Sequence, residues 1–225
     1  MRTQPQDVIA KLEADNSRLA KEKILLDAMN EGLDEFFEGL KMCLDKLYTF
    51  GVKQVPTKDE VVAGQGCPWN VFKDLAEKLY NRELTGHNAR DAINLVMSSA
   101  TAEQWNGFYR RILIKDLRCG VSEKTVNSVA KKNKFGKYMV PVFTCQLAHD
   151  SANHEKKLVG KKMLEVKLDG VRTLAIVHPD GKVDMLSRNG KEFTNFGHIQ
   201  DEISAVVKQD PPPYPLVLDL SLIHI

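Results

Sequence analysis

The sequence lacks the features that mark membrane, secreted and metal-binding proteins. It has no run of about eighteen apolar residues, so we expect no transmembrane helix and no membrane partner. The first residues contain no apolar stretch of the kind found in secretory signals. The four cysteines are far apart and form no CxxC pair, which argues against a zinc site or a disulfide framework. These absences favour a cytosolic protein with reduced thiols.

The composition is that of an ordinary globular protein, but the charge is unevenly distributed. The chain has 225 residues, of which 43% are hydrophobic and 28% charged, enough for one large or two modest domains. Residues 1–60 carry nine Lys/Arg and twelve Asp/Glu, whereas residues 110–137 carry nine Lys/Arg and two Asp/Glu. The second segment can neutralise nucleic-acid phosphates. A solvated helix face is the alternative explanation.

Residues 1–134 have the apolar periodicity of helices. Ser17 follows a break in the first apolar run and predicts the N-cap of a second helix. A loop is expected over 52–68, where prolines and glycines gather. Thr101 to Gln104 forms a capping box, and Ser122 is a suitable N-cap for a further helix. The first part of the chain is therefore expected to be a helical domain.

After Gly136 the pattern changes to short β-rich runs. A turn is predicted over 178–181, between two strands of a hairpin. The expected elements are an extended segment over 141–148, strands over 163–167, 172–178, 183–186 and 216–218, and a helix over 199–207. The expected fold class is multidomain, α followed by α+β.

One lysine has an unusual setting. In the predicted strand, period-2 alternation puts Glu165 and Lys167 on one face and aliphatic residues on the other, and Asp169-Gly170 then permits a sharp turn. A desolvated lysine loses its proton more easily, and the neutral amine is a nucleophile for which phosphorus is a plausible electrophile. The alternative is an edge-strand lysine paired with Glu165.

Two motifs connect this lysine with a known superfamily. The stretch from Lys167 to Arg172 reads KLDGVR and resembles the KxDGxR signature of the covalent nucleotidyltransferases, which include DNA ligases, RNA ligases and capping enzymes. The SRNG sequence from Ser187 to Gly190 resembles the motif that follows it in DNA ligases.

The resemblance implies a role for each motif residue. Lys167 would attack the α-phosphate of ATP, with Mg²⁺ bound mainly through the nucleotide phosphates rather than by this part of the chain. Glu165 would accept a hydrogen bond from adenine, and Asp169 would assist at the lysine or at the strand end. Arg172 would contact the nucleotide or the nick phosphate, and Arg188, helped by Ser187, would bind the 5′-phosphate of the nick.

The first half resembles one branch of this superfamily. The segments 84–89, 117–127 and 141–148 resemble parts of ATP-dependent DNA ligases of the phage type. The resemblance implies an all-helical DNA-binding domain over 1–134. It also implies a connector and the start of an ATP-grasp-like nucleotidyltransferase domain of α+β class over 135–219. The partners implied are ATP, Mg²⁺ and nicked double-stranded DNA. The protein is expected to be a monomer in the cytoplasm of an infected or host bacterial cell, serving DNA replication, repair and recombination.

The basic segment supplies the candidate DNA contacts. Gly120 and Ser122 would open a helix whose free N–H groups bind phosphate without reading sequence, although Gly120 also suits a plain turn between helices. The flanking cations in this set are Arg110, Arg111, Lys115, Arg118, Lys124, Lys131 and Lys132. A DNA-binding module without catalysis, or another KxDG enzyme such as an RNA ligase, remains an alternative.

The last six residues depart from the ligase pattern. After Asp219, family members continue with Gly-Glu, whereas this chain reads LSLIHI. CTGTCTCTTATACACATC, a transposase mosaic-end adapter, encodes these six residues. Residues 220–225 are therefore interpreted as a non-native tail, with a divergent natural terminus as the alternative. The fragment alone is expected to lack ligase activity.

Overall fold

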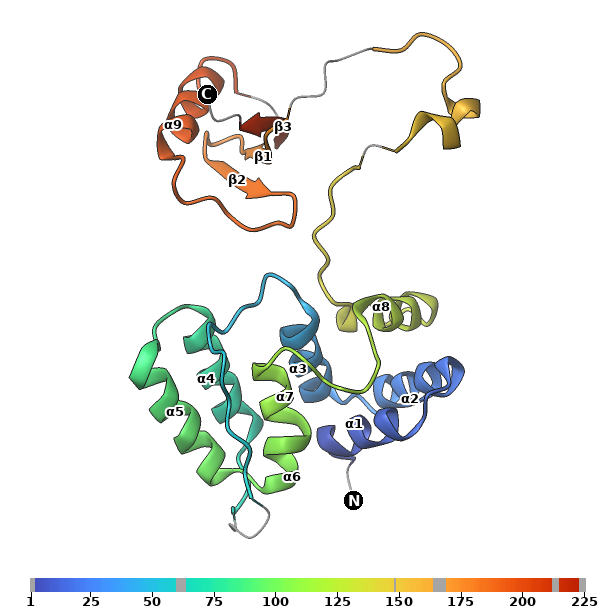
Figure 1. Cartoon of the computed structure of the whole chain (residues 1–225), viewed down its shortest axis with the longest axis vertical. Coiled ribbons are helices and arrows are strands. Elements are labelled where there is room, and N and C mark those ends of the chain that lie inside the picture. Colours follow the sequence, from blue (N-terminus) through green and yellow to red (C-terminus); the bar gives the residue numbers. More distant parts are fainter. Residues whose placement is uncertain (1–2, 60–63, 148, 164–168, 212–214, 223–225) are drawn as a thin grey trace. The chain divides into compact units, whose positions relative to one another are not determined.

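The chain forms two compact units, Met1–Val142 (unit 1) and Phe143–Ile225 (unit 2) (Figure 1). The computed structural model describes residues 3–59, 64–147, 149–163, 169–211 and 215–222. None of the helices in these ranges is long and apolar enough to cross a membrane.

Every regular element in the described part of unit 1 is helical. Its α-helices are α1 (Pro5–Ala14), α2 (Arg18–Asn30), α3 (Asp34–Leu44), α4 (Trp69–Tyr80), α5 (Gly86–Ser99), α6 (Ala102–Gln104), α7 (Arg110–Leu113) and α8 (Glu123–Lys132). A π-helical turn, Trp105–Tyr109, joins α6 to α7, and a 3-10 turn, Gly136–Tyr138, follows α8.

Aromatic side chains fill the core of unit 1. Trp105 is fully buried, and the rings of Phe72 and Tyr109 stack with their centroids 4.3 Å apart. On α3, a Cβ added at Gly39 would lie 2.5 Å from Cζ of Phe108. The absence of a side chain at this glycine therefore lets α3 lie directly against the π-helical turn, which close packing of the core requires.

Local sequence signals explain where several helices begin. Ser17 Oγ accepts a hydrogen bond from the first turn of α2. Thr101 and Gln104 form the predicted capping box, since each side chain accepts a hydrogen bond from the other residue's backbone N–H. These two predictions are confirmed. Ser122 occupies the N-cap of α8, but its side chain makes no capping hydrogen bond there.

Unit 1 extends past the boundary at residue 134 that the sequence suggests. The Tyr138 ring stacks on Phe37 with centroids 4.2 Å apart. The side-chain amide of Asn127 accepts a bond from Val140 N at 2.7 Å and donates one to Val140 O at 3.0 Å. The segment after α8 therefore packs on the helical core, and unit 1 ends at Val142.

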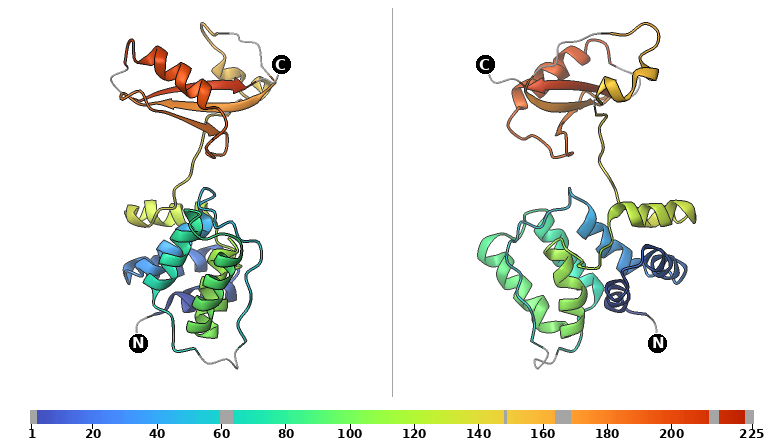
Figure 2. Two further views of the ribbon diagram at one scale, coloured as in Figure 1. Left: turned by 90° about the vertical axis from the view of Figure 1, so that its left-hand side faces the viewer. Right: turned by 45° about the vertical axis from the view of Figure 1, so that its right-hand side comes forward.

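Unit 2 contains a small antiparallel sheet covered by one helix. Its elements are two 3-10 turns (Ser151–Asn153 and Glu155–Lys157), β1 (Val171–Val177), β2 (Val183–Ser187), α9 (Gly197–Val207) and β3 (Leu216–Leu222). The strand order is β2-β1-β3, with both pairings antiparallel. Figure 2 shows α9 lying across the sheet. Ala175, Val177, Val183 and Met185 are buried in this small core, and apolar side chains of α9 pack on them. The three-stranded sheet with its helix is compatible with part of an α+β domain.

The predicted hairpin and the helix after it are confirmed, whereas β3 is longer than the sequence suggests. β3 runs to Leu222, and its register pairs Thr173 with Leu220 and Val171 with Leu222. Leu220 and Leu222 pack against the same core as α9, which explains why pairing continues past Asp219. The strand predicted over 163–167 falls mainly on residues 164–168, which lie outside the described residues.

Candidate active site and nucleic-acid interface

The KxDGxR motif leads into β1. Lys167 and Glu165 lie outside the described residues, so their roles stay predictions. Asp169 and Gly170 are exposed just before the strand. A Cβ added at Gly170 would lie 2.5 Å from the carbonyl oxygen of Leu222 and equally close to Ser221 Oγ. The motif glycine therefore lets the backbone of β3 pass beside the start of β1.

Arg172 is held by two parts of unit 2. Its Nε and Nη2 donate to the two carboxylate oxygens of Asp219 at 2.9 and 2.6 Å, a bidentate pair, and its Nη1 donates to the carbonyl of Gln146. The bond with Asp219 raises the pKa of the guanidinium further above its usual value. These bonds use three of the five N–H donors of the guanidinium, so Arg172 can bind a phosphate through the remaining donors or by exchanging one of these partners.

The SRNG motif forms a tight turn at the end of β2. Gly190 N donates to Ser187 O at 2.8 Å, and Lys191 N donates to Ser187 Oγ at 3.1 Å. Gly190 has φ +80°, and a Cβ there would lie 2.5 Å from Cγ of Phe143. Glycine is required on both counts, because L residues rarely adopt this φ and the Phe143 ring occupies the space. The turn leaves the Arg188 side chain exposed.

One extended segment touches both motifs. Phe143 packs on Gly190, Cys145 Sγ lies 3.6 Å from the carbonyl of Arg188, and Gln146 accepts from Arg172. Because residues 143–146 are consecutive, their contacts bring the start of β1 and the turn after β2 to one place in unit 2. The sequence predicted an extended connector over these residues but not its contacts with the two motifs. Asp219 was likewise missed as a partner, because only the β1–β3 register places it near Arg172.

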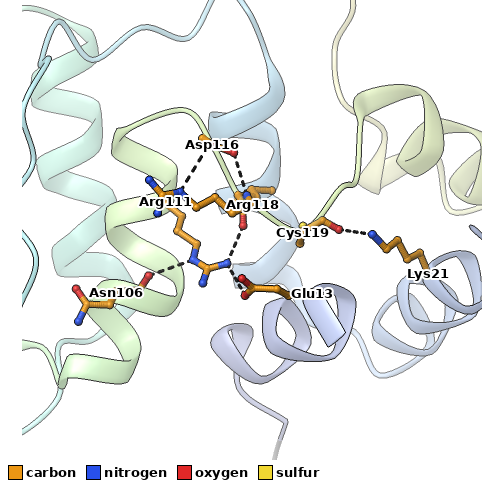
Figure 3. A network of polar contacts seen from close by, with 8 residues as sticks. Glu13, Lys21, Asn106, Arg111, Asp116, Arg118 and Cys119 are labelled. Carbon is orange, nitrogen blue, oxygen red and sulfur yellow. Dashed lines mark hydrogen bonds and ion pairs between the residues drawn. The ribbon is translucent and has the colours of Figure 1, made fainter. Parts of the chain in front are cut away.

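In the basic segment of unit 1, some cationic side chains bond to oxygen atoms of the protein itself (Figure 3). Arg111 is only 16% exposed. It donates from Nε to Asn106 O at 3.1 Å, and from Nη1 to Leu117 O and to Glu13 Oε2, both at 2.9 Å. Lys21, 8% exposed, donates to the Cys119 carbonyl at 2.7 Å. Two cations thus fasten the loop after α7 to α1 and α2.

Lys115 is also occupied. Its ammonium donates to the carbonyl oxygens of Met42, Asp45 and Tyr48 at 2.6, 2.6 and 2.7 Å. These carbonyls lie at the end of α3 and in the loop after it. The last C=O groups of a helix have no partner within the helix, so they need other hydrogen-bond donors. Burial lowers the pKa of Lys115. The geometry gives this lysine a structural task, and its predicted contact with DNA remains untested.

The other members of the predicted DNA-binding set differ in exposure. Gly120 has φ +64°, and a Cβ there would lie 2.6 Å from Lys21 Nζ, so the turn needs glycine for structural reasons. Arg110 is half-buried, and its Nε donates to Val55 O at 2.9 Å. The other four cations of the set are exposed. Arg118 Nε lies 3.6 Å from a carboxylate oxygen of Asp116, and the remaining three are lysines on α8: Lys124, Lys131 and Lys132. Ser122 is exposed as well.

Comparisons with known proteins now decide the family. Residues 144–224 match the family described as ATP dependent DNA ligase domain. Two solved structures of a ligase, Pmar-Lig_Pre. and Pmar-Lig_PreS3, are each 59% identical to this chain, with TM-scores of 0.83. The chain belongs to the ATP-dependent DNA ligases. Each match covers 99% of this chain and 50% of the other, so the chain spans about half the length of these ligase structures. No curated protein sequence matches it.

The family match covers nearly all of unit 2. It includes the sheet, α9, the SRNG turn and most of the segment that contacts both motifs, and also the residues outside the described ranges that contain Lys167. Among the described residues of this ligase chain, no group of three or more His, Cys, Asp or Glu side chains could hold a metal ion.

Proposed function

We propose that this chain is part of an ATP-dependent DNA ligase that seals nicks in duplex DNA through a lysyl-AMP intermediate on Lys167. The observation that supports this most directly is the segment 143–146, which contacts both Arg172 and the turn bearing Arg188. This supports the proposal that two arginines from separate motifs serve one site. Such a pair suits a reaction in which phosphate groups are transferred and stabilised, because guanidinium groups donate paired bonds to phosphate.

The proposed reaction has three steps. The neutral amine of Lys167 attacks the α-phosphorus of ATP, so an N–P bond forms, the bond to pyrophosphate breaks and the amine gives up a proton. An oxygen of the 5′-phosphate of the nick then attacks the phosphorus of the bound AMP, so a P–O bond forms, the N–P bond breaks and the Lys167 amine is restored. Attack by the 3′-hydroxyl finally forms the phosphodiester and releases AMP. Mg²⁺, held mainly by the ATP phosphates, would screen their negative charge during the attack of Lys167.

Each motif residue keeps a proposed role in these steps. Glu165 accepts a bond from the adenine amino group, and Asp169 assists near Lys167. Arg188 and Ser187 hold the 5′-phosphate at the tip of the β2 turn. Arg172 contributes a second phosphate contact, through its remaining donors or by exchanging a bond with Asp219 or Gln146. The pair with Asp219 would hold the guanidinium in place before the phosphate arrives.

The described residues fit this use of nucleotide and metal. Arg172 and Arg188 provide positive charge for phosphate, and the Arg188 side chain is exposed. Magnesium does not need a full set of protein ligands when the nucleotide phosphates supply most of them. Unit 1 is proposed to hold the nicked duplex through its phosphate backbone, with the protein acting as a monomer. Nick sealing by the 225-residue chain alone is not expected.

A labelling experiment tests the proposed function. The whole protein, expressed from its intact gene, is incubated with Mg²⁺ and ATP labelled at the α-phosphate. We expect one covalent label, abolished in Lys167→Arg and retained in the matched control Lys161→Arg, which changes an exposed lysine six positions earlier. Addition of a nicked duplex should discharge the label. A protein that binds duplex DNA but never takes up label would favour the non-catalytic alternative, and discharge by nicked RNA alone would favour an RNA ligase.

A further inference from the structure

Two adjoining hollows form an open groove on unit 1, lined mostly by residues outside the segment that the sequence marks as basic; Arg110 belongs to both the groove and that segment. One, of about 340 Å³, lies between the loop after α3 and the start of α5. The other, of about 580 Å³, lies between the same loop, α5 and α7. Figure 1 shows this loop descending between α5 and α7. Lys53, Gln54 and Arg90 line both hollows, so the two form one continuous surface.

Among the described residues, all the charged side chains that line the groove are positive. They are four cations, and the nearby Glu83 and Asp91 line neither hollow. We call it the basic groove, defined by Lys53, Arg82, Arg90 and Arg110. Lys53, Arg82 and Arg90 are exposed.

Three of these cations, like the exposed lysines of α8, are available to an external ligand, whereas Arg110 donates to Val55 O. Within the described residues, the side chains of Lys53, Arg82 and Arg90 make no ion pair and no hydrogen bond. Arg111 and Lys115, by contrast, are bonded to protein oxygens. A cation that has no protein partner breaks no protein hydrogen bond or ion pair when it binds an external phosphate.

The backbone shapes the groove around one of these arginines. Gly51 has φ +68°, and a Cβ there would lie 1.4 Å from Nη1 of Arg82. The guanidinium therefore lies directly over the glycine backbone, in space that a side chain at position 51 would fill. Beside it, Thr85 is the N-cap of α5 but makes no side-chain capping bond, so the partial positive charge of the helix start adds to the four cations.

We propose that the basic groove binds the phosphate backbone of duplex DNA and is the main electrostatic contact between unit 1 and its substrate. Duplex DNA carries one charge per about 1.7 Å of axis, so an open row of cations can engage several phosphates together. Contacts of this kind carry no sequence information, which suits an enzyme that must act on any nick. The proposal rests on the proposed ligase function and names the surface that serves it.

Two triple variants of the 225-residue chain compare this groove with the surface that the sequence predicts. K53Q/R82Q/R90Q removes three positive charges from the groove, and K124Q/K131Q/K132Q removes three from α8. All six side chains are exposed, so the variants match in charge and exposure. Binding of a fluorescent duplex is followed by anisotropy over a range of salt concentrations, and circular dichroism with thermal unfolding checks the fold. If the groove triple variant unfolds, the double variant K53Q/R90Q replaces it in the binding assay, because it keeps Arg82 and its packing on Gly51.

The groove triple is expected to bind at least about tenfold more weakly at 0.1 M salt, with the slope of log affinity against log salt reduced by about two to three. The α8 triple should lose less than about threefold, through weaker long-range attraction. Equal losses, or a larger loss for the α8 triple, would overturn the proposed location while leaving DNA binding by unit 1 intact. Failure of the unaltered chain to bind duplex DNA at low salt would instead refute the DNA-binding part of the proposed function, and the groove with it.

Discussion

Replacing Lys115 with methionine is expected to destabilise unit 1 strongly, because one ammonium group satisfies three backbone carbonyls. These acceptors belong to Met42, Asp45 and Tyr48, at and just beyond the end of α3. Methionine keeps nearly the length and the apolar character of the lysine stem and lacks the ammonium group. The substitution therefore isolates the hydrogen bonds from the packing of the aliphatic stem.

The size of the effect follows from the bonds that are lost. A hydrogen bond to a charged group contributes about 1.5–3 kcal/mol net. The three bonds of Lys115 share one ammonium, whose burial carries a cost that is visible in its lowered pKa. We therefore expect a total loss of about 2–4 kcal/mol rather than the full sum. For a unit of this size, that lowers the melting temperature by roughly 6–12 °C.

Urea and thermal unfolding followed by circular dichroism measure the loss. Lys124→Met, on the exposed face of α8, is the matched control, and it should change stability by less than about 0.5 kcal/mol. If Lys115→Met is as stable as this control, the three carbonyl bonds contribute nothing and the structural interpretation is wrong. A Lys115→Met protein that stays stable but binds duplex DNA much more weakly than the control would restore the sequence-based assignment of Lys115 as a DNA contact.

Two further predictions concern unit 2. Gly190→Ala is expected to cost about 1–2 kcal/mol, because alanine is strained at φ +80° and its Cβ would collide with Phe143. Unfolding of the variant in urea measures this, and a loss below about 0.3 kcal/mol would contradict the described turn. Hydrogen bonds from Lys182 and His178 lower the pKa of the Asp184 carboxyl below its usual value of 3.8, so their stabilisation is present above that pH and disappears as the pH falls through the lowered pKa. Thermal unfolding should therefore show Asp184→Asn less stable than the unaltered chain at pH 7, by a difference that shrinks as the pH is lowered below 3.8, whereas a difference that grows on acidification would contradict the assignment.

Much of the local structure could be predicted because its determinants lie within a few residues of one another. The capping box at Thr101 is an exchange of bonds between residues three apart, and the hairpin from β1 to β2 follows from alternating apolar residues around a tight turn. The spacing of apolar residues also indicated the helical character of the first part of the chain. Each of these signals depends on the backbone geometry of a single element.

The candidate site in unit 2 could be predicted only in part. The KxDGxR and SRNG motifs identify the chemistry that we propose, because residue types and short spacings are properties of the sequence. The bidentate partner of Arg172 could not be found in the same way, since Asp219 is 47 residues distant and reaches it only through the register of β1 with β3. The contacts of the connector with both motifs likewise depend on how the sheet folds.

The sequence by itself determined the family, the positions of most helices and strands, and the existence of a positively charged segment. Tertiary structure decided what each positive charge does. Arg111 and Lys115 belong to the basic segment, but packing turned them toward protein oxygens. Lys53, Arg82 and Arg90 are scattered along the chain, yet they meet in one groove. The reason is physical: helix and turn signals act over a few residues, whereas the partner of a long cationic side chain is set by which distant segments pack beside it.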